Sequence, residues 1–219
     1  MRSAGGPTRR ANSANPLHVG ADASDALVDE VEAFYAAQER PTIFRIPDMM
    51  AHMDAVLAAR GYRRAAPTRT LFGALRAGGM EDAAIRIDPQ PTARWLDARD
   101  RLSGASAADA VASRAIMGAI TLPSGFAGLE EGGEIVSLAF GVVQGDVLVL
   151  ESVMTDPAYR RTGCARRCIG ALARWAKGQG ARHIALQMMT DNQAALCLYE
   201  SLDISRDLYG YHYRIVARP

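Results

Sequence analysis

The sequence has few cysteines and few aromatic residues, and neither sign of charge dominates it. Only three of its 219 residues are cysteine, which excludes a disulfide framework and fits a reducing cytoplasm. Lys and Arg number 25 against 24 Asp and Glu, and this net charge of +1 argues against a global electrostatic grip on nucleic acid. No apolar run is long enough to span a membrane, and residues 1–12 lack the apolar core of a secretory signal.

Several common catalytic and metal-binding motifs are also missing. The chain has no G-x-G-x-x-G, Walker A, H-E-x-x-H or G-x-S-x-G pattern, so the usual dinucleotide, triphosphate, zinc-protease and serine-hydrolase sites are not expected. Cys164 and Cys168 stand one helical turn apart without a His or Cys cluster, and we expect no metal site. What is present is 49% apolar and 22% charged residues, the composition of a globular protein with a core.

Hydrophobic periodicity beyond residue 80 predicts a mixed α/β domain. Helical spacing and strand-like runs follow one another in the order α-α-β-β-β-α-β-α-β. This order indicates a twisted mixed sheet covered by helices. The predicted helices are residues 89–103, 106–117, 163–177 and 192–202, and the predicted strands are residues 125–130, 134–143, 147–155, 183–188 and 208–216.

The first 80 residues show a similar pattern on a smaller scale. In the first lobe 18 positions separate the strand residue Ile43 from Gly61, which follows the next helix. In the second lobe 19 positions separate the strand residue Ile184 from Asp203, which also follows the next helix. Equal element order at near-equal spacing indicates a diverged internal repeat. We therefore expect two lobes, 1–80 and 90–219. The elements expected in the first lobe are helices at 24–38 and 49–60, a strand at 42–46 and extended chain at 62–75 interrupted by Pro67.

The most informative segment is 153–165, in which a strand ends, a loop with two arginines and a glycine follows, and a helix begins at once. The first N–H groups of a helix lack internal partners and, with the helix dipole, form an anion site. Gly163 lets the backbone approach a ligand closely. Residues 157–190 contain seven basic and no acidic side chains. The pattern predicts a site for a small polyanion rather than a solvated basic helix face.

This loop, Arg160-Arg161-Thr162-Gly163-Cys164-Ala165, resembles the Q/R-x-x-G-x-G/A loop of the GNAT superfamily of N-acetyltransferases. The preceding Thr-Asp-Pro and the later Asn192-Gln193-Ala194-Ala195-Leu196-Cys197-Leu198-Tyr199-Glu200 are also similar to family sequences. The resemblance covers roughly residues 90–216. Residues 8–13 and 211–214 further resemble a two-lobed bacterial subgroup with a degenerate N-terminal acetyltransferase-like lobe. The first lobe of this sequence lacks the Arg-x-x-Gly-x-Gly signature, so we expect it not to bind CoA.

The resemblance implies a mixed sheet of the acyl-CoA N-acyltransferase type, acetyl-CoA as co-substrate, and a role for each matching residue. Tyr199 would protonate the leaving thiolate, and a phenol suits that role because it stays protonated until a basic thiolate forms. Asn192 would contact the pantetheine arm. The strand backbone of Val153, Met154 and Thr155 would pair with the same arm, and the pyrophosphate would be held by Arg160, Arg161, Thr162, Gly163, Cys164, Ala165 and Arg166.

The general base stays open between two candidates. Gln187 stands where some family members have a glutamate; it accepts no proton but can position a water molecule. Glu151 precedes the loop, and strand alternation puts it on one face with Val153. His183 and His212 are further alternatives, although a lone histidine is more often structural.

The sequence thus predicts an acyltransferase of the EC 2.3.1 type that moves an acetyl group to a primary amine of a small molecule or peptide, in the cytoplasm. The alternative is a catalytically impaired CoA-binding regulatory or structural protein. Gln187 and the Leu202-Asp203-Ile204 segment, where the family commonly has Leu-Gly-Phe, motivate that alternative. A nucleic-acid or peptide binder ranks last because aromatic residues are sparse in the arginine-rich segment. The acceptor and a homodimeric state are left open.

Overall fold

The computed structural model describes residues 1–219 except 7, 22–23, 77–81 and 217–219. The chain divides into two compact units. Unit 1 comprises Met1–Thr70, Met188–Asn192 and Asp207–Pro219, and unit 2 comprises Leu71–Gln187 and Gln193–Arg206. Both units contain helices and strands, so the fold is of the predicted mixed α/β class.

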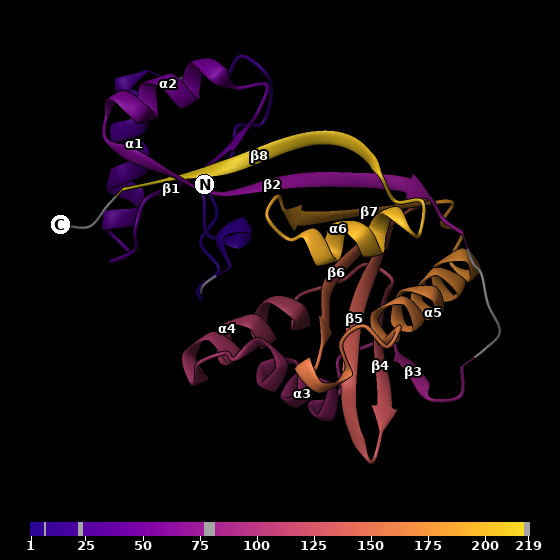
Figure 1. Ribbon diagram of the computed structural model, residues 1–219. Helices are drawn as coiled ribbons and strands as arrows, with labels where there is room; N and C mark the ends of the chain where they lie inside the picture. The colour runs from indigo at the N-terminus through magenta and orange to yellow at the C-terminus, as the bar shows by residue number, and fades with distance from the viewer. Residues whose placement is uncertain (7, 22–23, 77–81, 217–219) are drawn as a thin grey trace. The chain divides into compact units, whose positions relative to one another are not determined.

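Apart from the short strand β3 and two 3-10 helices, the helices and strands follow the predicted order along the chain (Figure 1). Helical elements are η1 (Arg9–Ala11), α1 (Asp25–Ala36), α2 (Ala51–Ala59), α3 (Ala93–Ser103), α4 (Ala107–Gly118), η2 (Pro157–Tyr159), α5 (Cys164–Gly178) and α6 (Gln193–Glu200), and strands are β1 (Ile43–Pro47), β2 (Tyr62–Ala74), β3 (Ile85–Asp88), β4 (Ser124–Glu131), β5 (Glu134–Gln144), β6 (Val147–Thr155), β7 (His183–Met189) and β8 (Arg206–Val216).

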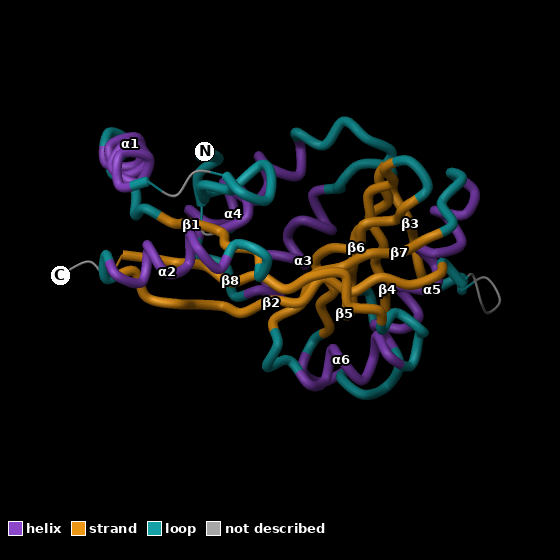
Figure 2. The backbone as a smooth tube through the Cα atoms, turned by 90° about the horizontal axis from the view of Figure 1, so that it is seen from above, coloured by secondary structure: helices purple, strands orange, loops and turns teal. Residues whose placement is uncertain are grey.

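Unit 1 is a small sheet in which β8 lies between β1 and β2. Phe44 and Ile46 of β1 share a core with Val31 of α1 and Leu57 of α2, so both helices pack on one face of this sheet (Figure 2). On the free edge of β1, Ala14 forms a parallel bridge with Phe44. The N-terminal segment therefore covers an edge that would otherwise present unpaired backbone groups.

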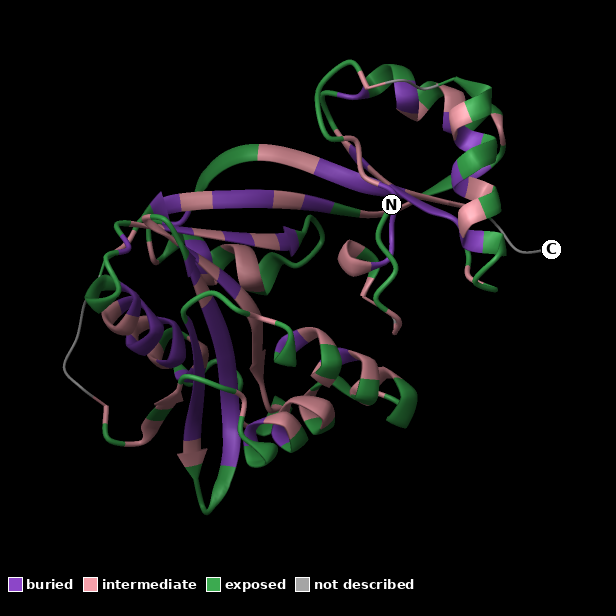
Figure 3. Cartoon of the chain, turned by 180° about the vertical axis from the view of Figure 1, so that it is seen from behind, coloured by how far each residue is buried: buried purple, intermediate pink, exposed green. Residues whose placement is uncertain are grey.

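Unit 2 holds the larger part of the sheet, in the order β2-β7-β6-β5-β4-β3. Strands β6 and β7 run parallel, whereas the pairs β3–β4, β4–β5 and β5–β6 are antiparallel. Trp95 of α3 packs edge-on against Phe126 of β4 and donates its indole N–H to the carbonyl of Ala127 at 2.9 Å, which anchors α3 to one face. Helix α5 packs on the other face, where Trp175 leaves room only for a glycine at position 125. Figure 3 shows the buried side of α5 turned toward the strands.

Three details differ from the sequence-based expectations. The helix expected from residue 89 begins at Ala93, because the Thr92 side chain caps it by accepting a hydrogen bond from the Trp95 N–H at 3.2 Å. Strand β3 was not predicted, although its four residues alternate apolar and charged side chains, because so short a run is a weak signal. Strand β2 continues through Pro67, where an interruption was expected.

The two compact units have other bounds than the predicted lobes 1–80 and 90–219, and the division into these lobes stays a prediction. From Asp207 onward, the C-terminal strand belongs to unit 1, because β8 pairs antiparallel with β1 from Ile43 opposite Ile215 to Pro47 opposite Tyr211. The internal repeat itself stays a prediction. Among the described residues, no helix has the length and apolar character needed to cross a membrane.

Candidate active site

Strands β6 and β7 pair over only part of their length. In the described chain their parallel ladder runs from Val147 opposite His183 to Leu150 opposite Leu186, although β6 continues to Thr155. On its other side β6 stays paired with β5 as far as Thr155. The half-buried residues Val153, Met154 and Thr155 thus extend beyond the ladder, and backbone groups on the β7 side of this segment can bond a ligand.

A β-bulge interrupts β6 at the start of this segment. Phe140 lies opposite Glu151 and Leu138 lies opposite Met154, so β6 has one residue more than β5 in this stretch. Ser152 adopts a left-handed conformation with a φ of 52°. Bulges re-aim side chains and are frequent beside active sites. The extra residue puts Glu151 on one face with Met154, and the expectation that alternation pairs it with Val153 was wrong.

Tyr199 is the buried residue of α6, with 7% of its surface exposed. Burial raises the pKa of its phenol to about 12, and the negative charge of Glu151 contributes in the same direction. The two predicted catalytic side chains therefore lie within electrostatic reach of each other, although 48 positions separate them in the sequence. A phenol with this pKa keeps its proton at neutral pH.

The loop between β6 and α5 has the backbone geometry of an anion site. Gly163 is the N-cap of α5 with a φ of 87°, and Arg161 is left-handed with a φ of 64°. Left-handed residues in such a turn direct successive N–H groups to one side. No side chain caps the helix start, and a Cβ at position 163 would meet nothing within 4 Å. The start of α5 therefore has no side-chain cap, and the backbone at Gly163 is open to close approach by a ligand.

Among the predicted loop residues, Cys164 is buried, Ala165 is half-buried and the others are exposed. Cys164 is buried, with its sulfur 3.1 Å from Thr162 Oγ1, and the same hydroxyl donates to the carbonyl of Tyr159 at 2.6 Å. These two contacts of the Thr162 hydroxyl stabilise the turn on the side facing the protein. Ala165 is half-buried, and the exposed members are Arg160, Arg161, Thr162, Gly163 and Arg166.

A brace from α3 holds the segment that leads into this loop. Asp156 caps η2 by accepting a hydrogen bond from the Ala158 N–H at 3.0 Å, and its other carboxylate oxygen accepts from Arg101 Nη1 at 3.0 Å. Arg101 also donates from Nη2 to the carbonyl of Ile135 at 2.8 Å. The sequence contained no signal for Arg101, because 55 positions separate it from Asp156.

The basic residues near the loop are less free than their number suggested. Arg167 forms an ion pair with Asp82 at 2.6 Å, and Arg182 pairs with Asp146 at 3.0 Å. Both acidic partners come from outside the segment that the charge count covered. The positive charge beside the loop is therefore carried mainly by Arg160, Arg161 and Arg166.

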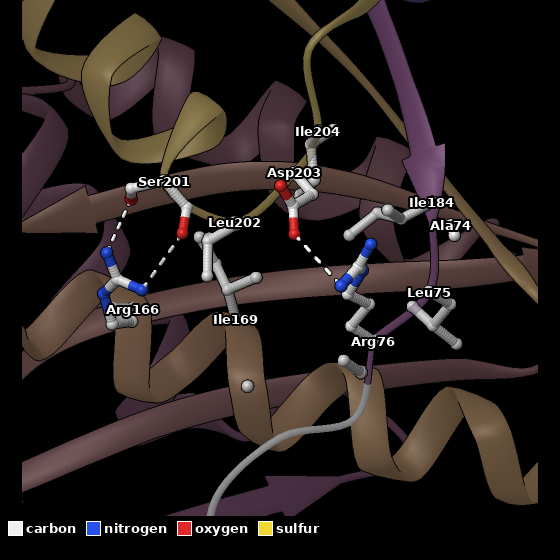
Figure 4. A pocket seen from close by; sticks show the side chains of 12 residues that line it. Ala74, Leu75, Arg76, Arg166, Ile169, Ile184, Ser201, Leu202, Asp203 and Ile204 are labelled. Carbon is white, nitrogen blue, oxygen red and sulfur yellow. Dashed lines mark hydrogen bonds and ion pairs between the residues drawn. The ribbon is translucent and has the colours of Figure 1, made fainter.

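A cavity of about 370 Å³ lies along α5, with Arg166 on its wall (Figure 4). Arg166 Nη2 donates to Ser201 Oγ at 2.6 Å, and Arg76 Nη1 lies 3.3 Å from Asp203 Oδ2. Asp203 has a φ of 60°, so aspartate takes the left-handed turn position after α6. The cavity combines two guanidinium groups with an apolar floor formed by Ile169, Ile184 and Leu202.

The remaining candidates have different surroundings. The ring of His183 stacks on Phe72 at 5.0 Å, and His212 in unit 1 is buried with Nε2 2.6 Å from Asp54, so both histidines have structural contacts. Gln187 lies on β7 directly after Leu186, where the printed ladder with β6 ends. Asn192 is exposed in the turn before α6 and belongs to unit 1, and its contact with the pantetheine arm stays a prediction. Among the described residues, no group of three or more His, Cys, Asp or Glu could hold a metal ion.

The mixed sheet with two parting parallel strands and a glycine-capped anion loop, together with the similarities that follow, identifies an N-acetyltransferase of the GNAT superfamily, an acyltransferase of the EC 2.3.1 class. A family model described as probable histone acetyltransferase Rv0428c C-terminal matches residues 1–214, and the chain belongs to this family.

The relatives have low sequence identity but similar length and fold. The uncharacterized N-acetyltransferase YobR of Bacillus subtilis is 25% identical over 224 residues, which cover 98% of this chain and 88% of that protein. A GCN5-related N-acetyltransferase from Kribbella flavida superposes with a TM-score of 0.68 at 16% identity, over 94% of this chain and 81% of that one. A tandem GNAT protein from the clavulanic acid biosynthesis pathway has a TM-score of 0.65 at 11% identity, over 89% and 70% of the two chains. The structural likenesses establish the fold.

Proposed function

We propose that the chain transfers an acetyl group from acetyl-CoA to the primary amine of a small molecule or peptide. This proposal rests mainly on the point at which β6 separates from β7, beside the bulge at Ser152. Glu151 precedes this bulge and lies within electrostatic reach of Tyr199. A thioester arm extended along β6 would lie between its anion-binding loop and these two side chains. The name of the family mentions histones, which supports an acceptor with a lysine-like amine.

The residues of unit 2 fit the two polar parts of acetyl-CoA. A diphosphate would accept hydrogen bonds from the first-turn N–H groups of α5 and would be attracted by Arg160 and Arg161. The backbone of residues 153–155 would bond the amides of the pantetheine arm as a further strand does. Arg166 is shared by the loop and the adjoining cavity, and we place the nucleotide end of the cofactor along this cavity. Asn192, a residue of unit 1, stays a predicted contact of the pantetheine arm.

In this mechanism the acceptor amine attacks the thioester carbonyl, the C–N bond forms and the C–S bond breaks. Glu151 takes the amine proton, directly or through a water molecule that Gln187 can orient. A backbone N–H near Met154 polarises the carbonyl. Placing amine and thioester together can contribute roughly 7–11 kcal/mol to the rate acceleration.

Tyr199 acts on the departing sulfur. A simple thiol has a pKa of about 8.5, below the value of about 12 that burial gives the Tyr199 phenol. Complete proton transfer from phenol to thiolate is therefore uphill. Tyr199 instead stabilises the negative charge on sulfur by donating a hydrogen bond while the C–S bond breaks.

The free thiols of Cys164, Cys168 and Cys197 support placing the reaction in a reducing cytoplasm.

The decisive experiment is calorimetric titration of acetyl-CoA into the wild type, Gly163→Glu and Gly180→Glu. Both glycines are left-handed, with φ values of 87° and 91°, both would have open space around a Cβ, and they flank opposite ends of α5. The two variants therefore carry matched backbone strain. Because only position 163 faces the diphosphate, we expect Gly163→Glu to weaken binding at least tenfold and Gly180→Glu to bind as the wild type does. A wild type that does not bind acetyl-CoA would overturn the proposal.

A further inference from the structure

Unit 1 contains a charged residue whose surroundings the proposed reaction does not use. Arg45 lies on β1, opposite Tyr213 of β8, and therefore on the face of this sheet that α1 and α2 do not cover. Its guanidinium carbon lies 3.8 Å from the centroid of the Tyr211 ring. A planar guanidinium on an aromatic face is a favourable cation–π arrangement, and it holds the arginine in one orientation.

The hydrogen bonds of Arg45 are incomplete. Nη2 donates to the hydroxyl of Tyr209 at 3.2 Å, whereas Nε is buried and has no hydrogen-bond partner. Over the described residues, no carboxylate lies within ion-pair distance of Arg45 or of Arg2. The contrast on the same strand pair is Arg214, which binds Asp54 through two nitrogens at 2.6 and 2.9 Å. A half-buried cation without a counter-charge is costly, and an anion would offset that cost.

A cavity of about 240 Å³ adjoins this guanidinium. Arg2, Asn15, Arg45 and Tyr209 supply its polar groups, and its apolar walls include Leu17 and Met49. Leu17 is 93% exposed and Met49 is 51% exposed, so both side chains present apolar surface at this cavity. The cavity therefore combines two cations without carboxylate partners and apolar surface that the chain itself leaves uncovered.

We propose that this cavity binds a small carboxylate with a short apolar body. The carboxylate would accept hydrogen bonds from Arg45 and be attracted by Arg2, because the guanidinium fork matches the two oxygens of a carboxylate. The apolar body would cover Leu17 and Met49. The limited volume restricts the ligand to a few carbon atoms beyond the carboxylate. All lining residues belong to unit 1, so the proposal stands independently of acetyl transfer in unit 2.

The test is a calorimetric or NMR titration of the full chain with hexanoate, compared with propionate, hexanamide and inorganic phosphate. We expect hexanoate to bind at least tenfold more tightly than hexanamide, which has the same body without the charge. Each buried methylene should strengthen binding about fourfold, so propionate should bind more weakly than hexanoate. Equal binding of hexanoate and hexanamide, tighter binding of phosphate, or no binding of hexanoate would each overturn the proposal.

Variants separate the cavity from general effects on the fold. Arg45→Met removes the stacked cation, and we expect at least a tenfold loss of hexanoate affinity. Since that variant also disturbs the contacts with Tyr209 and Tyr211, the exposed side chains provide the second test: Arg2→Ala and Leu17→Ser should each weaken hexanoate binding with unchanged thermal unfolding. Arg63→Ala removes an exposed cation of unit 1 outside the cavity and should bind hexanoate as the wild type does. Wild-type affinity in Arg45→Met and Leu17→Ser would refute the assignment.

Discussion

Replacing Arg101 with alanine tests how the anion loop is held in place. Arg101 donates to Asp156 at 3.0 Å and to the carbonyl of Ile135 at 2.8 Å, and its side chain is 45% exposed. An ion pair at that exposure contributes at most about 1 kcal/mol to stability, and the hydrogen bond to a carbonyl contributes about as much. Arg101→Ala should therefore lower the free energy of unfolding by about 1–2 kcal/mol.

Arg94 provides a matched control on the same helix. It donates to Glu130 at 2.9 Å and to the carbonyl of Gly133 at 2.6 Å, and its side chain is 52% exposed. Each arginine thus bonds one carboxylate and one carbonyl at similar exposure, but only Arg101 contacts Asp156, which caps η2 in front of the anion loop. We expect Arg94→Ala to lower stability by a similar amount, about 1–2 kcal/mol, and to leave cofactor binding unchanged.

The functional consequence of Arg101→Ala follows from Asp156. Without Arg101, Asp156 still accepts the hydrogen bond from the Ala158 N–H but loses its ion pair with α3. The loop is then less ordered in the free protein, and ordering it reduces the free energy gained when the ligand binds. One hydrogen-bonded contact of about 1 kcal/mol corresponds to a roughly fivefold increase in the Kd and KM for acetyl-CoA. Because Tyr199 and Glu151 lie on other elements, kcat should stay within a factor of two of the wild type.

Chemical denaturation, calorimetry and steady-state kinetics check these expectations. Equal effects of Arg101→Ala and Arg94→Ala on the Kd, or a loss confined to kcat, would refute the reasoning. Asp156→Asn keeps an acceptor for the Ala158 N–H and weakens the ion pair, so it should have an intermediate effect. Its combination with Arg101→Ala should be less than additive.

Three further predictions follow from the site and the two cores. Tyr199→Phe should lower kcat by about 10²–10³-fold at unchanged acetyl-CoA affinity, because it removes one hydrogen-bond donor to the developing charge on sulfur. Because the phenol pKa is about 12, the wild-type rate should show no loss from this group between about pH 7 and 10, as the initial-rate profile will reveal. The Arg214 guanidinium lowers the pKa of Asp54 from 3.8 to about 2; this carboxylate stabilises the fold above pH 4, by about 1 kcal/mol because solvent screens the partly exposed pair, and loses that contribution as the pH falls toward 2. Denaturation at several pH values should show this dependence in the wild type and not in Asp54→Asn. Gly73→Ala would bring a Cβ to 2.5 Å from the carbonyl oxygen of Asp203 and should cost about 1–3 kcal/mol of stability in denaturant unfolding.

Each of these has an outcome that contradicts it. A Tyr199→Phe enzyme with full kcat would remove the tyrosine from the mechanism. An acid-unfolding profile that is the same in Asp54→Asn and in the wild type would show that another group carries the pH dependence. Gly118→Ala is the control for Gly73→Ala, since a Cβ there meets nothing within 4 Å. Equal losses in the two variants would contradict the steric argument.

The sequence by itself determined the features that depend on neighbouring residues. The loop after β6, its glycine cap and the amphipathic α5 are local, because a left-handed glycine, a helix start and an apolar stripe are set within one or two turns of chain. The left-handed Asp203 was predictable for the same reason. These features were sufficient to indicate the superfamily.

Only the tertiary structure decided what depends on partners distant in the chain. The bulge at Ser152 reflects the register of β6 against β5, and it changed the face on which Glu151 lies. The proximity of Glu151 and Tyr199 and the brace from Arg101 to Asp156 likewise join separate elements. Local propensity carries no information about such contacts, because many distant residues of the right chemistry compete for each position and packing selects among them.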